Sequence, residues 1–203
     1  RQILPASYGS DLGFIWKPFS SLLINAAAWH LFLGQEFVYV GDAGIVEPGG
    51  KTRRVGADVS VRWQPTKHFS ADANINYAHA RSIEDPKGEN YIPLAPTFTS
   101  TGGLNYQHNS WNASIRYRYL ANRAATEDYS ITAKGYFVTD ASISYAFRKF
   151  EIGTVIENLF NTEWNETQFE TESQLQGETS SVTEIHFTPG TPFNFRAVLS
   201  YKF

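Results

Sequence analysis

The sequence predicts an all-β chain of about nine antiparallel strands, because its apolar residues recur with period two and its connections are alternately short and long. Every second side chain is apolar in "VGADVSVRW" (55–63), "WNASIRYRY" (111–119) and "FNFRAVLSYKF" (193–203). A period of two residues is typical of strands with two unlike faces. The longest apolar run, residues 22–33, falls short of the roughly 20 residues that a membrane helix needs.

The connections between the expected strands differ in length from one end of the strands to the other. Short links lie at about 18–21, 64–68, 108–110 and 148–149, and long links lie at about 34–53, 82–97, 122–135 and 160–192. Tight turns at one rim and long loops at the other are typical of membrane β-barrels. A soluble sandwich, the alternative, rarely has loops beyond about 12–15 residues. We therefore expect an up-and-down transmembrane β-barrel.

Aromatic residues gather near both ends of the expected strands, as the aromatic girdles of a membrane barrel do. Those beside the short links are Trp63, Phe69, Trp111, Phe147 and Phe150. Those toward the long links are Phe32, Tyr77, Tyr117, Tyr119 and Tyr136. A sandwich with aromatic core ends would show a similar pattern.

Composition excludes several function classes. The 203 residues carry a net charge of −3, so no basic surface for nucleic acid is expected. Without cysteine there is no disulfide, thiolate metal site or cysteine nucleophile. The five histidines lack ligand spacing and no catalytic motif is present. We expect no enzyme activity, no cofactor and no resident metal.

Three segments resemble TonB-dependent outer-membrane receptors: "PGGKTRRVGADVSVRW" (48–63), "IENLFNTEW" (156–164) and "FTPGTPFNFRAVLSYKF" (187–203). Such transporters have about 22 strands around a plugged lumen. The resemblance implies that residues 1–203 are the C-terminal portion of the barrel, and that the plug domain and TonB box lie upstream. It also implies the outer membrane of a Gram-negative bacterium, with a periplasmic C-terminus.

The resemblance implies energy-coupled uptake of a scarce nutrient, with a ferric siderophore or similar metal chelate as the first expectation. Vitamin, haem and glycan remain open as substrates. A passive porin is the alternative function, and a structural or adhesive barrel comes third. The implied partners are outer-membrane lipid, the plug domain, the TonB–ExbB–ExbD complex and the barrel-assembly machinery. The terminal strand resembles the signal that this machinery reads, with Leu199, Tyr201 and Phe203 at its apolar positions.

The long segment 161–192 contains six glutamates and no lysine or arginine. Like charges at this density favour a mobile, extended loop unless a cation or partner neutralises them. The segment is interpreted either as a solvated cover or as a site that captures cations, metal chelates or, through divalent ions, anionic lipid. Trp164, Phe169 and His186 could add stacking or ligation there.

Other candidate substrate-binding residues lie in the loops and on the barrel wall. The loop aromatics are Phe37, Tyr39, Tyr91 and Tyr129. Arg116 and Arg118 share the polar parity of residues 111–119, so both are expected to face the lumen, because a charge facing lipid is costly. There they would suit an anionic chelate or a carboxylate of the plug.

Overall fold

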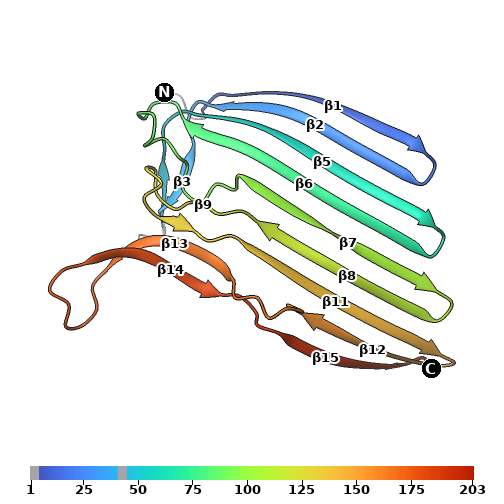
Figure 1. Cartoon of the computed structure of the whole chain (residues 1–203). Coiled ribbons are helices and arrows are strands. Elements are labelled where there is room, and N and C mark those ends of the chain that lie inside the picture. The colour runs from blue at the N-terminus through green and yellow to red at the C-terminus, as the bar shows by residue number, and fades with distance from the viewer. Residues whose placement is uncertain (1–4, 41–44) are drawn as a thin grey trace.

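The computed structural model describes residues 5–40 and 45–203, and these residues form one large antiparallel sheet and three small hairpins (Figure 1). The large sheet has nine strands that pair in chain order without a crossover, as predicted. They are β1 (Ser7–Phe19), β2 (Leu22–Leu33), β5 (Thr52–Thr66), β6 (Phe69–Ser82), β7 (Phe98–His108), β8 (Trp111–Leu120), β11 (Tyr136–Phe147), β12 (Phe150–Glu157) and β15 (Asn194–Tyr201).

The two rims of the sheet differ as the link lengths predict. Four tight turns lie together at the right in Figure 1, and Asn109 and Arg148 within them adopt positive φ values of 51° and 54°. The C-terminus lies at this short-turn rim, where the Lys202 amide donates to the Lys149 carbonyl at 2.8 Å. The long connections gather at the opposite rim.

Each long connection that carries strands of its own forms a hairpin. These pairs are β3 (Phe37–Val40) with β4 (Ile45–Pro48), β9 (Arg123–Ala124) with β10 (Thr132–Ala133), and β13 (Asn165–Ser173) with β14 (Val182–Pro189). The buried apolar side chains of the described residues also lie toward this long-loop rim: Ala80, Ala124, Ala125, Ala133 and Val138. No helix in the described part of the chain is long and apolar enough to cross a membrane.

The strand register gives the sheet a polar face and an apolar face. Asp58 pairs with Asn76, whose amide donates to the Asp58 carboxylate at 2.8 Å. Ser114 pairs with Ser142, and their hydroxyls lie 2.9 Å apart. Because paired residues project on the same side of an antiparallel sheet, these side chains define one polar face.

The apolar face carries an aromatic belt near each rim. Near the long loops, ring centroids lie 6.1 Å apart for Tyr8 and Phe32 and 5.8 Å apart for Phe98 and Tyr119. Near the short turns, Trp111 packs on Tyr145 at 4.7 Å. The assignment of Tyr136 to a girdle is wrong. Tyr136 lies two residues before Val138, which pairs with Arg118, so it belongs to the polar face.

The base of the longest connection is fastened by Asn158, which is 1% exposed. Its side-chain amide donates to the carbonyls of Thr162 and Thr191 at 2.8 and 3.0 Å, and its Oδ1 accepts from the Thr162 amide at 2.8 Å. Its φ of 52° lies in the left-handed region, which asparagine tolerates better than most residues. Asn158, within the segment "IENLFNTEW", thus joins both ends of the connection.

The two faces can be tested with spin labels in the full-length barrel reconstituted in lipid. Labels on the apolar face should contact the lipid-soluble quencher oxygen, whereas labels on the polar face should contact a water-soluble nickel chelate. The apolar positions are Ala113, Ile115 and Tyr117, and the polar positions are Asn112, Ser114 and Arg116. The opposite parity would contradict the assignment of faces.

Replacement of Asn158 should loosen the β13–β14 hairpin at its base. Asn158→Ala removes three buried hydrogen bonds, at about 1 kcal/mol each, and leaves two carbonyls without this donor. We expect glutamyl endopeptidase to cut the hairpin tip, residues 174–181, at least tenfold faster. Asn109→Ala is the matched control, because Asn109 also has a positive φ but lies at the other rim. Equal cleavage of both variants would show that Asn158 does not fasten the hairpin.

Candidate functional site

A cavity of about 640 Å³ lies between the β10–β11 connection and the base of the β13–β14 hairpin. This volume is within the usual range for small-molecule sites. Its lining combines apolar walls with one cation and one carboxylate, and includes Lys134, Glu163, Trp164, Ile185 and Phe187. The cavity therefore offers aromatic, aliphatic and charged contacts at the long-loop rim.

Trp164 connects this cavity to the polar face of the sheet. Its ring centroid lies 4.9 Å from that of Tyr136, and the Arg118 guanidinium carbon lies 5.2 Å from the indole centroid. The indole Nε1 donates to the Thr191 carbonyl at 3.1 Å. A Cβ at Gly190 would come within 2.1 Å of the indole ring, so glycine is needed there for Trp164 to close over the chain.

Three of the six glutamates of segment 161–192 lie in register positions of the β13–β14 hairpin, whereas their charge alone favours a mobile, extended loop. Glu170 pairs with Ile185, Glu172 with Thr183, and Glu184 with Thr171. In each pair a neutral residue stands opposite the carboxylate, so the strands avoid direct repulsion between like charges. Mobility and response to divalent cations stay predictions.

A lysine of a neighbouring connection, Lys134, lies beside segment 161–192. The Gln168 side chain donates to the Lys134 carbonyl at 2.7 Å and accepts from the Lys134 amide at 3.0 Å. Gln168 is buried, and this pair of bonds holds the hairpin beside the β10–β11 connection. Lys134 thereby lines the same cavity as Trp164 and Glu163.

Arg116 and Arg118 both lie on the polar face, and each has a carboxylate partner. The Arg116 Nη1 and Nη2 donate to the two Asp72 oxygens at 2.5 and 2.9 Å. This pair spans β7 at Gly103, where a Cβ would come within 2.7 Å of the Arg116 side chain. Arg118 lies 3.6 Å from Asp140. Their role in substrate binding stays a prediction.

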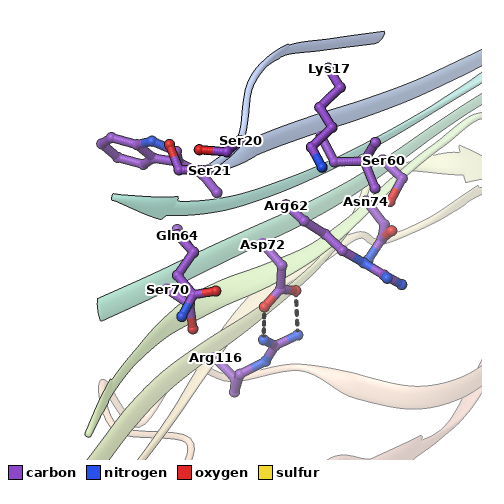
Figure 2. A pocket seen from close by; sticks show the side chains of 13 residues that line it. Lys17, Ser20, Ser21, Ser60, Arg62, Gln64, Ser70, Asp72, Asn74 and Arg116 are labelled. Carbon is purple, nitrogen blue, oxygen red and sulfur yellow. Dashed lines mark hydrogen bonds and ion pairs between the residues drawn. The ribbon is translucent and has the colours of Figure 1, made fainter. Parts of the chain in front are cut away.

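A second hollow, of about 590 Å³, lies on the polar face near the short turns (Figure 2). Figure 2 shows Lys17, Arg62 and Arg116 around it, with Asp72 bonded to Arg116. Among the side chains that the structure describes, Lys17 and Arg62 have no ion-pair partner, so the hollow carries an excess of positive charge. It suits a carboxylate or another anion.

Tyr91 and Tyr129 come together away from the Trp164 cavity. Their ring centroids lie 5.0 Å apart, and the Arg81 guanidinium carbon lies 3.9 Å above the Tyr91 ring. Tyr91 also forms a β-bridge with Arg81, which the sequence reasoning did not connect to it. Neither tyrosine lines the cavity at Trp164.

Tyr129 sits in a turn held by Asp128. The Ser130 amide and hydroxyl donate to the Asp128 carboxylate at 3.0 and 2.7 Å, and the hydrogen bond from the Ser130 amide is the main cause that lowers the Asp128 pKa to about 2. The stabilisation is therefore present above the ordinary aspartate pKa and is lost as the pH falls through about 2.

Phe169 and His186 stand directly opposite each other in the β13–β14 hairpin, with ring centroids 6.2 Å apart. The His186 Nε2 lies 3.5 Å from the Glu184 carboxylate. Among the described residues no group of three or more histidine, aspartate and glutamate side chains could hold a metal ion. Phe37 is exposed at the start of β3. Tyr39 is not among the side chains that the structure describes.

The terminal aromatics lie on the apolar face at the short-turn rim. The Tyr201 centroid lies 5.0 Å from that of Phe150 and 5.2 Å from that of Phe203. Leu199 is 72% exposed on the same face. An assembly signal at these residues stays a prediction.

Arg123 is a charged residue that sequence reasoning did not single out. It is 9% exposed in β9, and burial lowers the pKa of its guanidinium. Its Nη1 finds no hydrogen-bond partner among the residues described. The segment "LANRAAT" (120–126) gives no pattern that distinguishes Arg123 from a solvated loop cation.

Solved structures with the same fold include import receptors and a transporter. The chain is similar to the ferric-catecholate import receptor Fiu from E. coli K12, with 21% identity, a TM-score of 0.71, and coverage of 97% of this chain and 27% of that one. It is also similar to the ferric yersiniabactin uptake receptor FyuA from Yersinia pestis, with 15% identity, a TM-score of 0.70, and coverage of 97% of this chain and 30% of that one. The copper transporter OprC has 18% identity and a TM-score of 0.71, and the match covers 97% of this chain and 32% of that one. The chain thus spans about a third or less of each.

A search of curated protein sequences found no match. The family profile described as "TonB dependent receptor-like, beta-barrel" matches residues 7–159, which is most of the chain. The strand order, the unequal rims and the two-faced sheet agree with that family's barrel. The chain belongs to the β-barrel family of TonB-dependent receptors.

Proposed function

We propose that residues 1–203 are the C-terminal barrel portion of a receptor that imports a metal chelate across the outer membrane with energy from the TonB–ExbB–ExbD complex. A ferric siderophore is the first candidate substrate. Family membership supports the transport class, and the names of Fiu, FyuA and OprC support a metal-containing substrate. The C-terminus would lie in the periplasm, at the short-turn rim.

The observation that carries the proposal is the cavity of about 640 Å³ at Trp164. A chelate with aromatic or apolar parts could stack on the indole, while Lys134 attracts its negative charge. Arg118, behind the indole, links this capture site to the polar face that would line the lumen. The barrel itself would bind and conduct the substrate without covalent chemistry.

The positively charged hollow at Lys17 and Arg62 would serve the later part of transport. In a barrel of this family the polar face surrounds a plug domain, so an acidic side chain of the plug could rest there. An anionic chelate released from the plug would meet the same charges. The strand ladder and the paired Arg116 would keep the wall rigid while the plug moves.

Uptake by the full-length receptor tests the proposal against a passive porin. A strain whose receptor gene is deleted and then restored as the full-length gene should take up radioactive ferric iron. The iron is supplied as a catecholate, hydroxamate or citrate complex. We expect uptake of at least one complex to stop when TonB is deleted or the proton-motive force is collapsed. A porin would continue to admit the complex, and that outcome would contradict the proposal.

Replacing Trp164 tests the capture site. Trp164→Ala should weaken binding of the transported ferric complex about tenfold, because aromatic residues at the centre of binding sites contribute strongly. Fluorescence quenching or isothermal titration of the purified full-length receptor measures this affinity. Trp111→Ala is the control, since Trp111 packs on Tyr145 on the apolar face. Equal affinity of the two variants for the ferric complex would show that Trp164 does not contribute to the binding site.

A further inference from the structure

Two histidines that are 40 positions apart in the sequence meet at the short-turn rim of the sheet. His68 lies in the tight turn between β5 and β6, and His108 is the last residue of β7. Their ring centroids lie 4.3 Å apart, with an interplanar angle of 88°. The His108 Nδ1 lies 3.2 Å from the His68 Nε2 and 3.3 Å from the His68 Nδ1. The spacing of the histidines in the sequence does not predict this contact.

The backbone around both histidines is held by hydrogen bonds of the two turns. The Thr66 hydroxyl accepts from the His68 amide at 3.2 Å, and the His68 carbonyl accepts from the Gln107 amide at 2.8 Å. His108 ends β7 beside the β7–β8 turn, in which Asn109 adopts a φ of 51°. Both imidazoles therefore project from fixed turns, which reduces the entropy that a shared ligand would have to remove.

A neighbouring carbonyl or side-chain amide engages one nitrogen of each ring. The His68 Nδ1 lies 3.0 Å from the Gln107 carbonyl. Because a carbonyl can only accept, this Nδ1 carries the hydrogen and the His68 Nε2 keeps its lone pair. The His108 Nε2 lies 3.1 Å from the Asn109 side-chain amide, which donates in one orientation and accepts when it is flipped. Histidines that bind metals are typically held in this way, through the ring nitrogen that does not touch the metal.

The separation of the two imidazoles matches the space that one metal ion needs. Two imidazole nitrogens that bind the same ion, at about 2.0–2.1 Å each, lie about 2.9–3.3 Å apart. The rings are perpendicular in this structure, so a rotation about the Cβ–Cγ bond of His68 is needed to aim both lone pairs at one position. That torsion is soft in histidine. Among the described residues no third histidine or carboxylate joins the pair, so water would complete the coordination.

We propose that His68 and His108 bind one divalent transition-metal ion at the short-turn rim, with Cu²⁺ bound most tightly. Imidazole nitrogen suits Cu²⁺, Ni²⁺ and Zn²⁺, and the affinity of such a site is highest for Cu²⁺ among the first-row divalent ions. In the metal-bound state the His108 hydrogen lies on Nε2, and the Asn109 amide oxygen accepts it. The ion would tie the β5–β6 turn to the β7–β8 turn. The site lies at the rim opposite Trp164 and is independent of the proposed transport function.

Copper binding to the purified full-length receptor in detergent tests this site. The protein carries an affinity tag without histidine and is stripped with EDTA before Cu²⁺ is added as its glycine complex. Isothermal titration measures the number and affinity of bound ions, and electron spin echo envelope modulation counts the imidazoles on each copper. Wild type should bind one more Cu²⁺ than His68→Ala with His108→Ala, and that ion should show two imidazoles. His68→Ala alone should leave one imidazole and weaken binding about tenfold or more, since even the outer partners of metal ligands contribute that much.

The matched control also removes two histidines, through His30→Ala with His186→Ala, and should bind copper as wild type does. These two lie on β2 and β14, which belong to different sheets. Heat-modifiable migration reports whether each barrel is folded, and if the double variant at the turns does not fold, His68→Ala alone replaces it. A single imidazole on every copper of the wild type, equal numbers of bound ions in wild type and the folded variant, or binding only at millimolar Cu²⁺ would each overturn the proposal.

Discussion

The pairing of every strand with its neighbours is the constraint on which the other features depend. Backbone groups that face hydrocarbon must be hydrogen-bonded within the protein, so the strands form a continuous ladder. The register of the ladder decides which face of the sheet each side chain occupies. A shift of one residue would move every side chain of a strand to the opposite face. The pairing of Asp58 with Asn76 and of Ser114 with Ser142 shows polar residues meeting across this ladder. The same register assigns Arg53 and Arg54 to opposite faces.

At the long-loop rim the backbone groups are also hydrogen-bonded within the protein, but by hairpins in place of the large sheet. The connections at this rim are too long for tight turns, so three of them pair with themselves as hairpins and satisfy their own backbone groups. Asn158 closes the base of the longest connection, and Gln168 fastens that hairpin to its neighbour. The cavity at Trp164 results from these two attachments, since its walls come from both segments.

Which charged side chains are neutralised depends on their neighbours in the folded chain more than on the composition of their own segment. The acidic segment 161–192 has no cation of its own, yet Lys134 is held beside it by Gln168. Arg116 is neutralised by Asp72, which is 44 positions away and on a strand that is not adjacent to its own. Gly103 makes this contact possible because no side chain stands between them. The receptor wall therefore combines neutralised arginines with a few exposed cations that remain available to anions.

The sequence by itself determined the nine strands, the unequal rims and the two faces, because a period of two residues and the lengths of links are local properties of the chain. It also identified the family through short motifs, and it assigned Arg116 and Arg118 to the polar face by their parity. It misassigned Tyr136, since the side chain's parity within β11 outweighs its aromatic character. Only the tertiary structure decided which candidates meet: Trp164 with Arg118, Tyr91 with Tyr129 and Arg81, and Arg116 with Asp72. These contacts join residues far apart in the chain, and they depend on strand register and on how loops fold back, which no local pattern encodes.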